Sequence, residues 1–300
     1  MSSVNDFIGA ERVLEISSRC HIRYSENRFV IERRDDAFEI EVPCDDVLVM
    51  MLESEQSTIT SATLAACAER AIPVIVCQRH LPVGISLPMD ASWNAAEIRR
   101  LQAHALRGEA AARRLWRRTV RAKIFAQSAA LEMQGTRGVA RLRRLANSVG
   151  LDGAETIEAQ AAALYWRELL LDFERRDDKD PRNGLLNWGY AVLLASIGRA
   201  LSTLGLDPAL GFGHSGQSNS WALACDLMEP FRPSIDRLVA EVGRGGLFSD
   251  PKIVKTDILA LFALDGPAKV KIVDTVRGYR EFLDDGNESR VPYPDRPLIA

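Results

Sequence analysis

The first ninety residues alternate apolar and polar positions with a period of two, which predicts short β-strands. Polar junctions separate four such segments, over residues 12–17, 21–26, 28–33 and 37–42. Residues 46–52 are apolar without alternation, as in a strand that is buried on both faces. Evenly spaced short strands predict a meander or a sandwich with one buried face.

A helix and two further strands complete this N-terminal part. Residues 61–71 are rich in alanine and predict a helix, and residues 72–77 and 83–88 predict strands. Proline and polar residues over 88–94 mark a boundary. We therefore expect a β domain over residues 1–90.

From residue 95 onward the apolar positions follow a helical spacing. The pattern predicts helices over residues 95–134, with a weak point at Gly108, and over 141–146, 154–174, 185–204, 221–242, 253–264 and 270–283. Gly205 is expected to end the fourth of these helices, and residues 284–300 are expected to be irregular. The predicted fold class is α+β, with a small N-terminal β-sandwich-like domain followed by a larger all-α domain over residues 95–300.

The composition is that of a globular chain, with 300 residues of which 47% are apolar and 26% charged. No apolar run is long enough to span a bilayer, and the first residues lack the apolar core of a signal peptide. The five cysteines include no C-x-x-C pair, which favours free thiols over disulfides. We expect a cytoplasmic protein without membrane contact.

The net charge of −3 hides a basic segment in the middle of the chain. Residues 97–147 contain 13 basic and 3 acidic residues, whereas residues 1–96 carry a net charge of −7 and residues 148–300 one of −6. Its densest part holds six basic residues at helical spacing: Arg113, Arg114, Arg117, Arg118, Arg121 and Lys123. Such a stripe is either a solvated helix face or a surface that neutralises nucleic-acid phosphates, and the shortage of acidic partners favours phosphates.

Three side chains, Glu158, His214 and Glu229, are candidates for catalysis, and Asp226 is a further acidic residue close to Glu229 in the sequence. His214 lies among three closely spaced glycines in a predicted loop, and Glu158 precedes a run of small residues on a predicted helix. Asp226 and Glu229 share a helix face, and Pro230 predicts a kink beside them. Taken singly, each could also be a structural or solvated residue.

If Glu158, His214 and Glu229 meet in the fold, they form a metal site with two carboxylates and one imidazole. Carboxylate oxygens suit Mg²⁺ and Mn²⁺, and the imidazole favours Mn²⁺ or heavier ions. A non-haem iron oxygenase is disfavoured because it requires two histidines. No motif supports nucleophilic Ser/His or Cys/His catalysis, and neither a P-loop nor a G-x-G-x-x-G motif occurs.

Several of these motifs together resemble the CRISPR-associated integrase family, the first-numbered Cas protein. The similarity extends over residues 183–237, and EAQAAALYW (158–166) resembles that family's glutamate motif. The segment DLMEPFRP (226–233) is similar to the corresponding segment of members from type II systems. The family's β domain followed by a larger helical domain agrees with the pattern described above.

The resemblance assigns roles to individual residues. It implies that Glu158, His214 and Glu229 are the catalytic metal ligands, and that Asp226 supports them. Asn187 and Tyr190 match an L-N-x-x-Y element and are expected to support the site. Ala159 departs from the motif, where glycine is usual, but leaves the ligand itself unchanged.

The implied function is metal-dependent integration of DNA during CRISPR adaptation. The 3′-hydroxyl ends of a short captured DNA attack the CRISPR repeat, and the same site is expected to cleave branched DNA. The implied partners are double-stranded DNA, a second copy of the chain, and the small second Cas protein. Two dimers would flank one partner dimer in a heterohexamer, and other type II adaptation factors are further candidate partners.

Two other functions compete with this one. A non-catalytic DNA-binding scaffold would keep the fold without the chemistry, but the intact ligand set argues against it. A metal-dependent hydrolase of small phosphoesters would not need the basic segment. The size of the substrate distinguishes an integrase from such a hydrolase.

Overall fold

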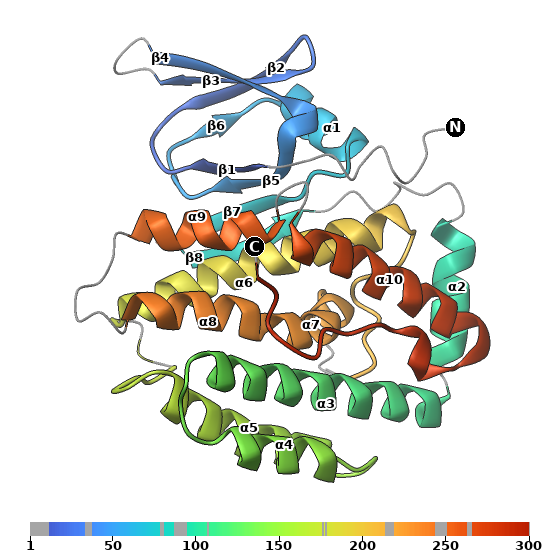
Figure 1. Ribbon diagram of the computed structural model, residues 1–300. Helices are drawn as coiled ribbons and strands as arrows, with labels where there is room; N and C mark the ends of the chain where they lie inside the picture. Colours follow the sequence, from blue (N-terminus) through green and yellow to red (C-terminus); the bar gives the residue numbers. More distant parts are fainter. Residues whose placement is uncertain are drawn as a thin grey trace.

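A small module of β-strands lies on top of a larger assembly of helices in the computed structural model (Figure 1). The structure describes residues 12–33, 38–78, 81–86, 95–106, 108–175, 177, 179–213, 219–243, 251–262 and 266–299. The predicted α+β class is therefore confirmed. The boundary predicted over 88–94 lies outside the described residues.

The β module consists of two four-stranded sheets. One sheet has the order β4-β3-β2-β6, formed by Phe38–Pro43, Arg28–Arg33, His21–Ser25 and Thr58–Ile59. The other has the order β1-β5-β7-β8, formed by Arg12–Ile16, Val47–Leu52, Val74–Gln78 and Leu81–Ser86. A short helix, α1 (Ser61–Glu69), begins where the side chain of Thr60 accepts a hydrogen bond from the Thr63 amide.

The pairing of the strands differs from a simple meander. Strands β2, β3 and β4 are antiparallel neighbours as the even spacing suggests, but β1 pairs in parallel with β5 in the other sheet. The five residues from Val47 to Met51 are all buried, so the prediction of a strand buried on both faces is confirmed. Strand β6 has only two residues, too few to produce an alternating pattern.

The predicted helices are present, with shifted ends. They are α2 (Ala95–Leu106), α3 (Glu109–Met133), α4 (Val139–Ser148), α5 (Ala154–Leu169), α6 (Pro181–Thr203), α7 (Ala222–Met228), α8 (Arg232–Gly243), α9 (Pro251–Phe262) and α10 (Pro267–Asp285). Helix α6 begins earlier than predicted because Asp180 caps it and Pro181 occupies its first position. Helix α5 ends five residues early, and the chain then turns through Asp172, which has a positive φ of 48°.

Where the sequence predicts a kink at Pro230, the structure has a 3-10 turn, η3 (Glu229–Phe231), which divides the predicted helix over 221–242 into α7 and α8. Proline lacks the N–H that an uninterrupted α-helix would use at this point. Asp226 therefore lies on α7, while Glu229 lies on the turn that follows it.

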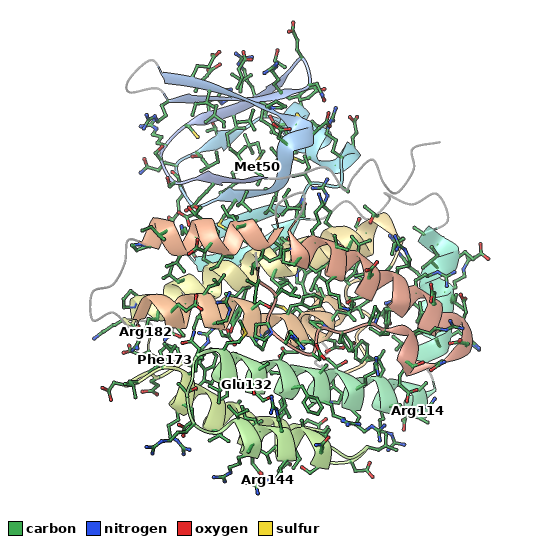
Figure 2. The ribbon with its side chains drawn as sticks, in the orientation of Figure 1. Met50, Arg114, Glu132, Arg144, Phe173 and Arg182 are labelled. Atoms are coloured by element: carbon green, nitrogen blue, oxygen red, sulfur yellow. The ribbon has the colours of Figure 1, made fainter. Side chains whose placement is uncertain are left out.

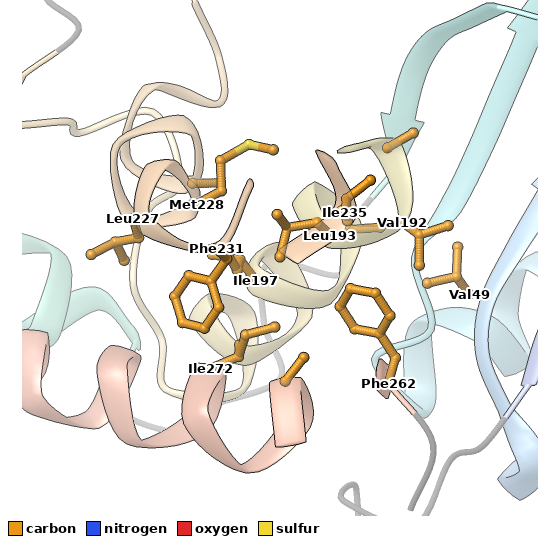
Figure 3. Packing of buried hydrophobic residues seen from close by; sticks show 14 of the residues in the cluster. Val49, Val192, Leu193, Ile197, Leu227, Met228, Phe231, Ile235, Phe262 and Ile272 are labelled. Carbon is orange, nitrogen blue, oxygen red and sulfur yellow. The ribbon is translucent and has the colours of Figure 1, made fainter. Parts of the chain in front are cut away.

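One hydrophobic core joins the β module to the helices. Helix α6 is buried on most of its circumference and lies at the centre, where Val192, Leu193 and Ile197 pack among other helices and β5 (Figure 3). Val49 of β5 belongs to the same cluster. Among the helices that the structure describes, none has the length and apolar character that a membrane span requires. All five cysteines are free thiols, as predicted.

A buried arginine links the same two parts through main-chain carbonyls. The Arg199 guanidinium on α6 donates to the carbonyls of Val47 and Leu48 at 3.1 Å each and to that of Arg70 at 3.2 Å. Burial lowers the pKa of Arg199 to about 10.

Replacing Arg199 with methionine is expected to lower the free energy of unfolding by roughly 3 kcal/mol, because two buried carbonyls and one partly buried carbonyl lose their donor. Urea unfolding followed by circular dichroism measures this loss. Arg167→Met, at an exposed position of α5, is the control and should change stability by less than about 0.5 kcal/mol. Equal stabilities of the two variants would contradict the role of Arg199 as a link.

Candidate active site

Two glutamates from distant parts of the chain converge on one lysine. Glu158 comes from α5, Glu229 from the turn η3, and Lys123 from α3. The Lys123 Nζ lies 2.5 Å from Glu158 Oε1 and 2.5 Å from Glu229 Oε2. The exposed fractions of the side chains are 14% for Lys123, 18% for Glu158 and 4% for Glu229. The carboxylates thus surround one small volume that is nearly closed to solvent and holds a positive charge.

A second cation helps to keep Glu229 charged inside the protein. The Arg232 guanidinium at the start of α8 lies 3.2 Å from Glu229 Oε1. Burial disfavours the charged form of Lys123, but Glu229 and Glu158 outweigh this effect and hold the pKa of Lys123 above its ordinary value. The pKa of Arg232 is raised for a similar reason, with Glu229 as the main opposing charge. Buried carboxylates persist when cations compensate them in this way.

Asp226 fixes the loop that leads toward the predicted histidine. Its Oδ2 accepts hydrogen bonds from the amides of Phe212 at 2.7 Å and Gly213 at 2.8 Å. Asp226 is fully buried on α7, three residues before Glu229. The Asp226 carboxylate thus ties this loop to α7, the helix that directly precedes the turn carrying Glu229.

Two glycines allow this loop to approach its neighbours closely. A Cβ atom at Gly211 would lie 2.8 Å from Asp226 Oδ2, and one at Gly213 would lie 2.1 Å from the Trp116 ring. The ring of Phe212 stacks on that of Tyr279, with centroids 5.8 Å apart. The main chain is therefore held on several sides up to residue 213.

His214 lies outside the described residues. Of the three predicted ligands, the structure therefore locates Glu158 and Glu229. Within the described ranges, no three histidine, cysteine, aspartate or glutamate side chains converge as a metal cluster. Glu158 and Glu229 do meet, and their oxygen donors suit a hard divalent cation. Since one cation already contacts both carboxylates, the two glutamates fit a metal ion in donor type and charge.

Asn187 and Tyr190 belong to a polar cluster that reaches Glu229 through Arg232. The sequence indicated only part of this cluster. The Tyr190 hydroxyl donates to Asp236 Oδ1, and the Tyr165 hydroxyl donates to Asp236 Oδ2 at 3.1 Å. The Arg232 guanidinium lies over the Tyr190 ring, 4.9 Å from its centroid. Asn187 Oδ1 accepts a 2.7 Å hydrogen bond from Arg175, whose guanidinium also lies over the Tyr190 ring.

Sequence analysis missed Asp236, Arg232 and the bridging position of Lys123. Asp236 follows Glu229 by seven residues, or about two helical turns, so a helical projection of residues 226–236 could have indicated that they share a face. The spacing of basic residues assigns Lys123 to the basic stripe, but its side chain contacts the two glutamates instead. Lys123 lies two positions after Arg121, which turns it roughly 200° around a helix, away from that residue's face.

Asp236 is expected to make stability depend on pH. Burial raises its pKa to about 6, and the hydrogen bonds from Tyr190 and Tyr165 only partly oppose this. The ordinary pKa is 3.8, so the folded chain holds this proton more tightly than the unfolded chain. The stabilisation is complete below about pH 4 and is lost as the pH rises through about 6, by roughly 3 kcal/mol in all.

Urea unfolding at a series of pH values measures this dependence. Asp236→Asn removes the titrating group and should flatten the decline relative to the unmodified chain. Asp274→Asn, at a half-exposed position of α10, should preserve it. Parallel curves for the unmodified chain and Asp236→Asn would contradict the assignment.

The residues of the basic stripe have different surroundings in the structure. Arg114 pairs with Glu288 at 3.3 Å, and Arg118 donates to the Val291 carbonyl at 3.1 Å, so both hold the C-terminal segment against α3. Arg117 and Arg121 line a surface pocket with Phe125, and Arg113 is exposed. The six residues thus do not form one uniform surface.

Comparison with known proteins agrees with this architecture. The family model "CRISPR associated protein Cas1" matches residues 15–257. The CRISPR-associated endonuclease Cas1 of Neisseria meningitidis is 36% identical over 207 residues, 68% of this chain and 67% of that protein. The CRISPR-associated endonuclease Cas1 2 of Pyrobaculum aerophilum is 30% identical over 247 residues, 77% of this chain and 82% of that protein.

Solved structures share the fold at lower sequence identity. A CAS1 protein from Thermotoga maritima matches with a TM-score of 0.75 and 16% identity, over 91% of this chain and 97% of that one. A casposase bound to integration product matches with a TM-score of 0.74 and 18% identity, over 95% and 93%. A chain of a Cas6-RT-Cas1–Cas2 complex matches with a TM-score of 0.77 and 17% identity, over 94% of this chain but 36% of that longer one.

A two-sheet β module followed by a helical domain is thus the fold that this chain shares with CAS1 and casposase structures. The sequence matches identify a family, whereas the structural matches show only the fold. The chain belongs to the CRISPR associated protein Cas1 family.

Proposed function

We propose that this protein is a metal-dependent DNA integrase of CRISPR adaptation, which joins the 3′-hydroxyl ends of short foreign DNA to a CRISPR repeat and also cleaves branched DNA. The observation that carries the proposal is the convergence of Glu158 and Glu229 around one partly buried cation. Relatives named endonucleases and a similar casposase bound to integration product support this chemistry.

Glu158 and Glu229, with His214 as a third ligand, would hold Mg²⁺ or Mn²⁺. Such an ion would acidify the attacking 3′-hydroxyl and stabilise charge on the phosphate. Asp226 keeps the loop before His214 in place, and Arg232 compensates the charge of Glu229. His214 either serves only as a ligand or also removes the proton from the 3′-hydroxyl.

The partners follow from the same proposal. They are double-stranded DNA, a second copy of this chain, and the small second Cas protein, in a heterohexamer of two dimers around one partner dimer. The similarity to a chain from a Cas6-RT-Cas1–Cas2 complex supports the second Cas protein as a partner. The N-terminal β module, net −7 over residues 1–96, is better suited to protein contacts than to DNA.

A strand-transfer assay tests the function. The purified chain, with and without its small Cas partner, is mixed with labelled short duplex DNA and a supercoiled repeat plasmid in Mg²⁺, Mn²⁺ or EDTA. We expect joined product in the divalent metals and none in EDTA, with no hydrolysis of a small chromogenic phosphodiester. DNA binding without joining in any metal would instead favour the non-catalytic scaffold.

The DNA surface is expected to include α4 as well as α3. Arg144 on α4 points away from the rest of the protein (Figure 2) and is exposed, as is Arg141. Leu142 and Ala146 of the same helix are buried. Because Arg114 and Arg118 also hold the C-terminal segment, charge reversal there would combine two effects. Arg144 therefore offers the cleaner test.

Arg144→Glu is expected to weaken duplex binding roughly three- to tenfold at moderate salt and to reduce the slope of log affinity against log salt by about one. Fluorescence anisotropy over a salt series measures both quantities. Arg19→Glu, the same charge change in the exposed turn between β1 and β2, is the control. An unchanged salt slope for Arg144→Glu would remove α4 from the DNA surface.

A further inference from the structure

Lys123 occupies the position that a shared metal ion would need. Its Nζ lies 2.5 Å from an oxygen of Glu158 and 2.5 Å from an oxygen of Glu229. Hard divalent cations bind carboxylate oxygens at roughly 2.0–2.6 Å. An ammonium group and a metal ion bridging the same two oxygens would therefore overlap, and their like charges would repel.

Lys123 also belongs to the helix that carries much of the basic segment. It lies on α3, the helix of Arg113, Arg117 and Arg121, and 14% of its side chain is exposed. A lysine ammonium is a point charge on a flexible four-carbon stem, so it can exchange one anionic partner for another. A DNA phosphate entering the site would offer such a partner.

We propose that Lys123 is an internal cation that holds Glu158 and Glu229 together in the metal-free protein and moves to a DNA phosphate when metal binds. DNA and metal then favour each other's binding, because both draw Lys123 away from its resting position. This inference rests on the proposed function, since it takes the two glutamates as metal ligands and DNA as substrate.

The chain contains a matched control for the loss of such a lysine. Lys255 on α9 also contacts two carboxylates, Glu15 on β1 and Glu53 just after β5, the latter at 3.6 Å. Its side chain is partly buried, as is that of Lys123. Removing either lysine leaves a pair of acidic side chains without their shared cation, but only Lys123 lies at the proposed metal site.

Mn²⁺ binding to the full chain, followed by the electron paramagnetic resonance signal of free Mn²⁺, tests the inference. Each protein is titrated alone and with a duplex that lacks 3′-hydroxyl groups, so that no joining occurs. For the unmodified chain, the duplex should tighten Mn²⁺ binding roughly tenfold. Lys123→Met should bind Mn²⁺ roughly tenfold more tightly without DNA, and the duplex should then add less than about threefold.

Lys255→Met should retain the Mn²⁺ affinity and the DNA effect of the unmodified chain. If Lys123→Met does not fold, Lys123→Gln keeps hydrogen-bonding capacity without charge and should change Mn²⁺ binding in the same direction. Equal or weaker Mn²⁺ binding by the Lys123 variants, or an undiminished DNA effect, would overturn the inference. Absence of saturable Mn²⁺ binding in every protein, with or without DNA, would reject the proposed metal site itself.

Discussion

Replacing Glu229 with glutamine is expected to reduce strand transfer at least roughly 1,000-fold, equivalent to about 4 kcal/mol of lost transition-state stabilisation. Glutamine keeps the size of the side chain but removes the negative charge that faces Lys123 and Arg232. The proposed metal ion would lose a charged ligand, and two partly buried cations, Lys123 and Arg232, would lose much of their compensation. The rate of joining of labelled duplex to the repeat plasmid, measured in Mn²⁺, gives the effect.

The matched control is Glu241→Gln on α8, which removes a half-exposed glutamate that pairs with Arg237. This variant should join DNA at the unmodified rate. Duplex binding measured by anisotropy should be retained in Glu229→Gln, which separates loss of chemistry from loss of substrate. Joining by Glu229→Gln within a few-fold of the unmodified rate would argue that Glu229 is a structural residue only.

Replacing Asp226 with alanine is expected to reduce strand transfer roughly 100-fold by releasing the loop before His214. The variant removes the acceptor for the amides of Phe212 and Gly213, while Glu158 and Glu229 remain in place. Hydrogen exchange at these two amides should become faster, which reports on the loop independently of catalysis.

Asp284→Ala, at an exposed carboxylate on α10, serves as the control for loss of an aspartate and should leave both the activity and the loop amides unchanged. Slow exchange at Phe212 and Gly213 in Asp226→Ala would mean that the glycine contacts and the Phe212–Tyr279 stack hold the loop without the carboxylate.

Local periodicity predicted much of the fold because the buried face of each helix or strand fixes the spacing of its apolar residues. The alternation over residues 21–42 corresponds to β2, β3 and β4, and the weak point at Gly108 separates α2 from α3. The pairing of β1 with β5 could not be read in the same way. Strand order depends on contacts between segments distant along the chain, which a local pattern does not contain.

The sequence also predicted only part of the candidate site, because local patterns identify side chains but not their distant partners. Residue types and motif spacing singled out Glu158, Glu229 and Asp226 as the acids, and the structure brings the two glutamates together. The role of Asp236 was not visible, because its partners Tyr165 and Tyr190 come from two other helices. His214 stays a prediction, since it lies outside the described residues.

By itself the sequence determined the α+β class, the positions of most helices and strands, the break at Pro230 and the identity of the acidic residues, because these depend on local spacing and side-chain chemistry. The tertiary structure alone decided that Lys123, 35 residues before Glu158, bridges that glutamate to Glu229. It also decided that Arg114 and Arg118 hold the C-terminal segment. A side chain's charge is set by its type, but its partner is set by the packing that brings distant elements into contact.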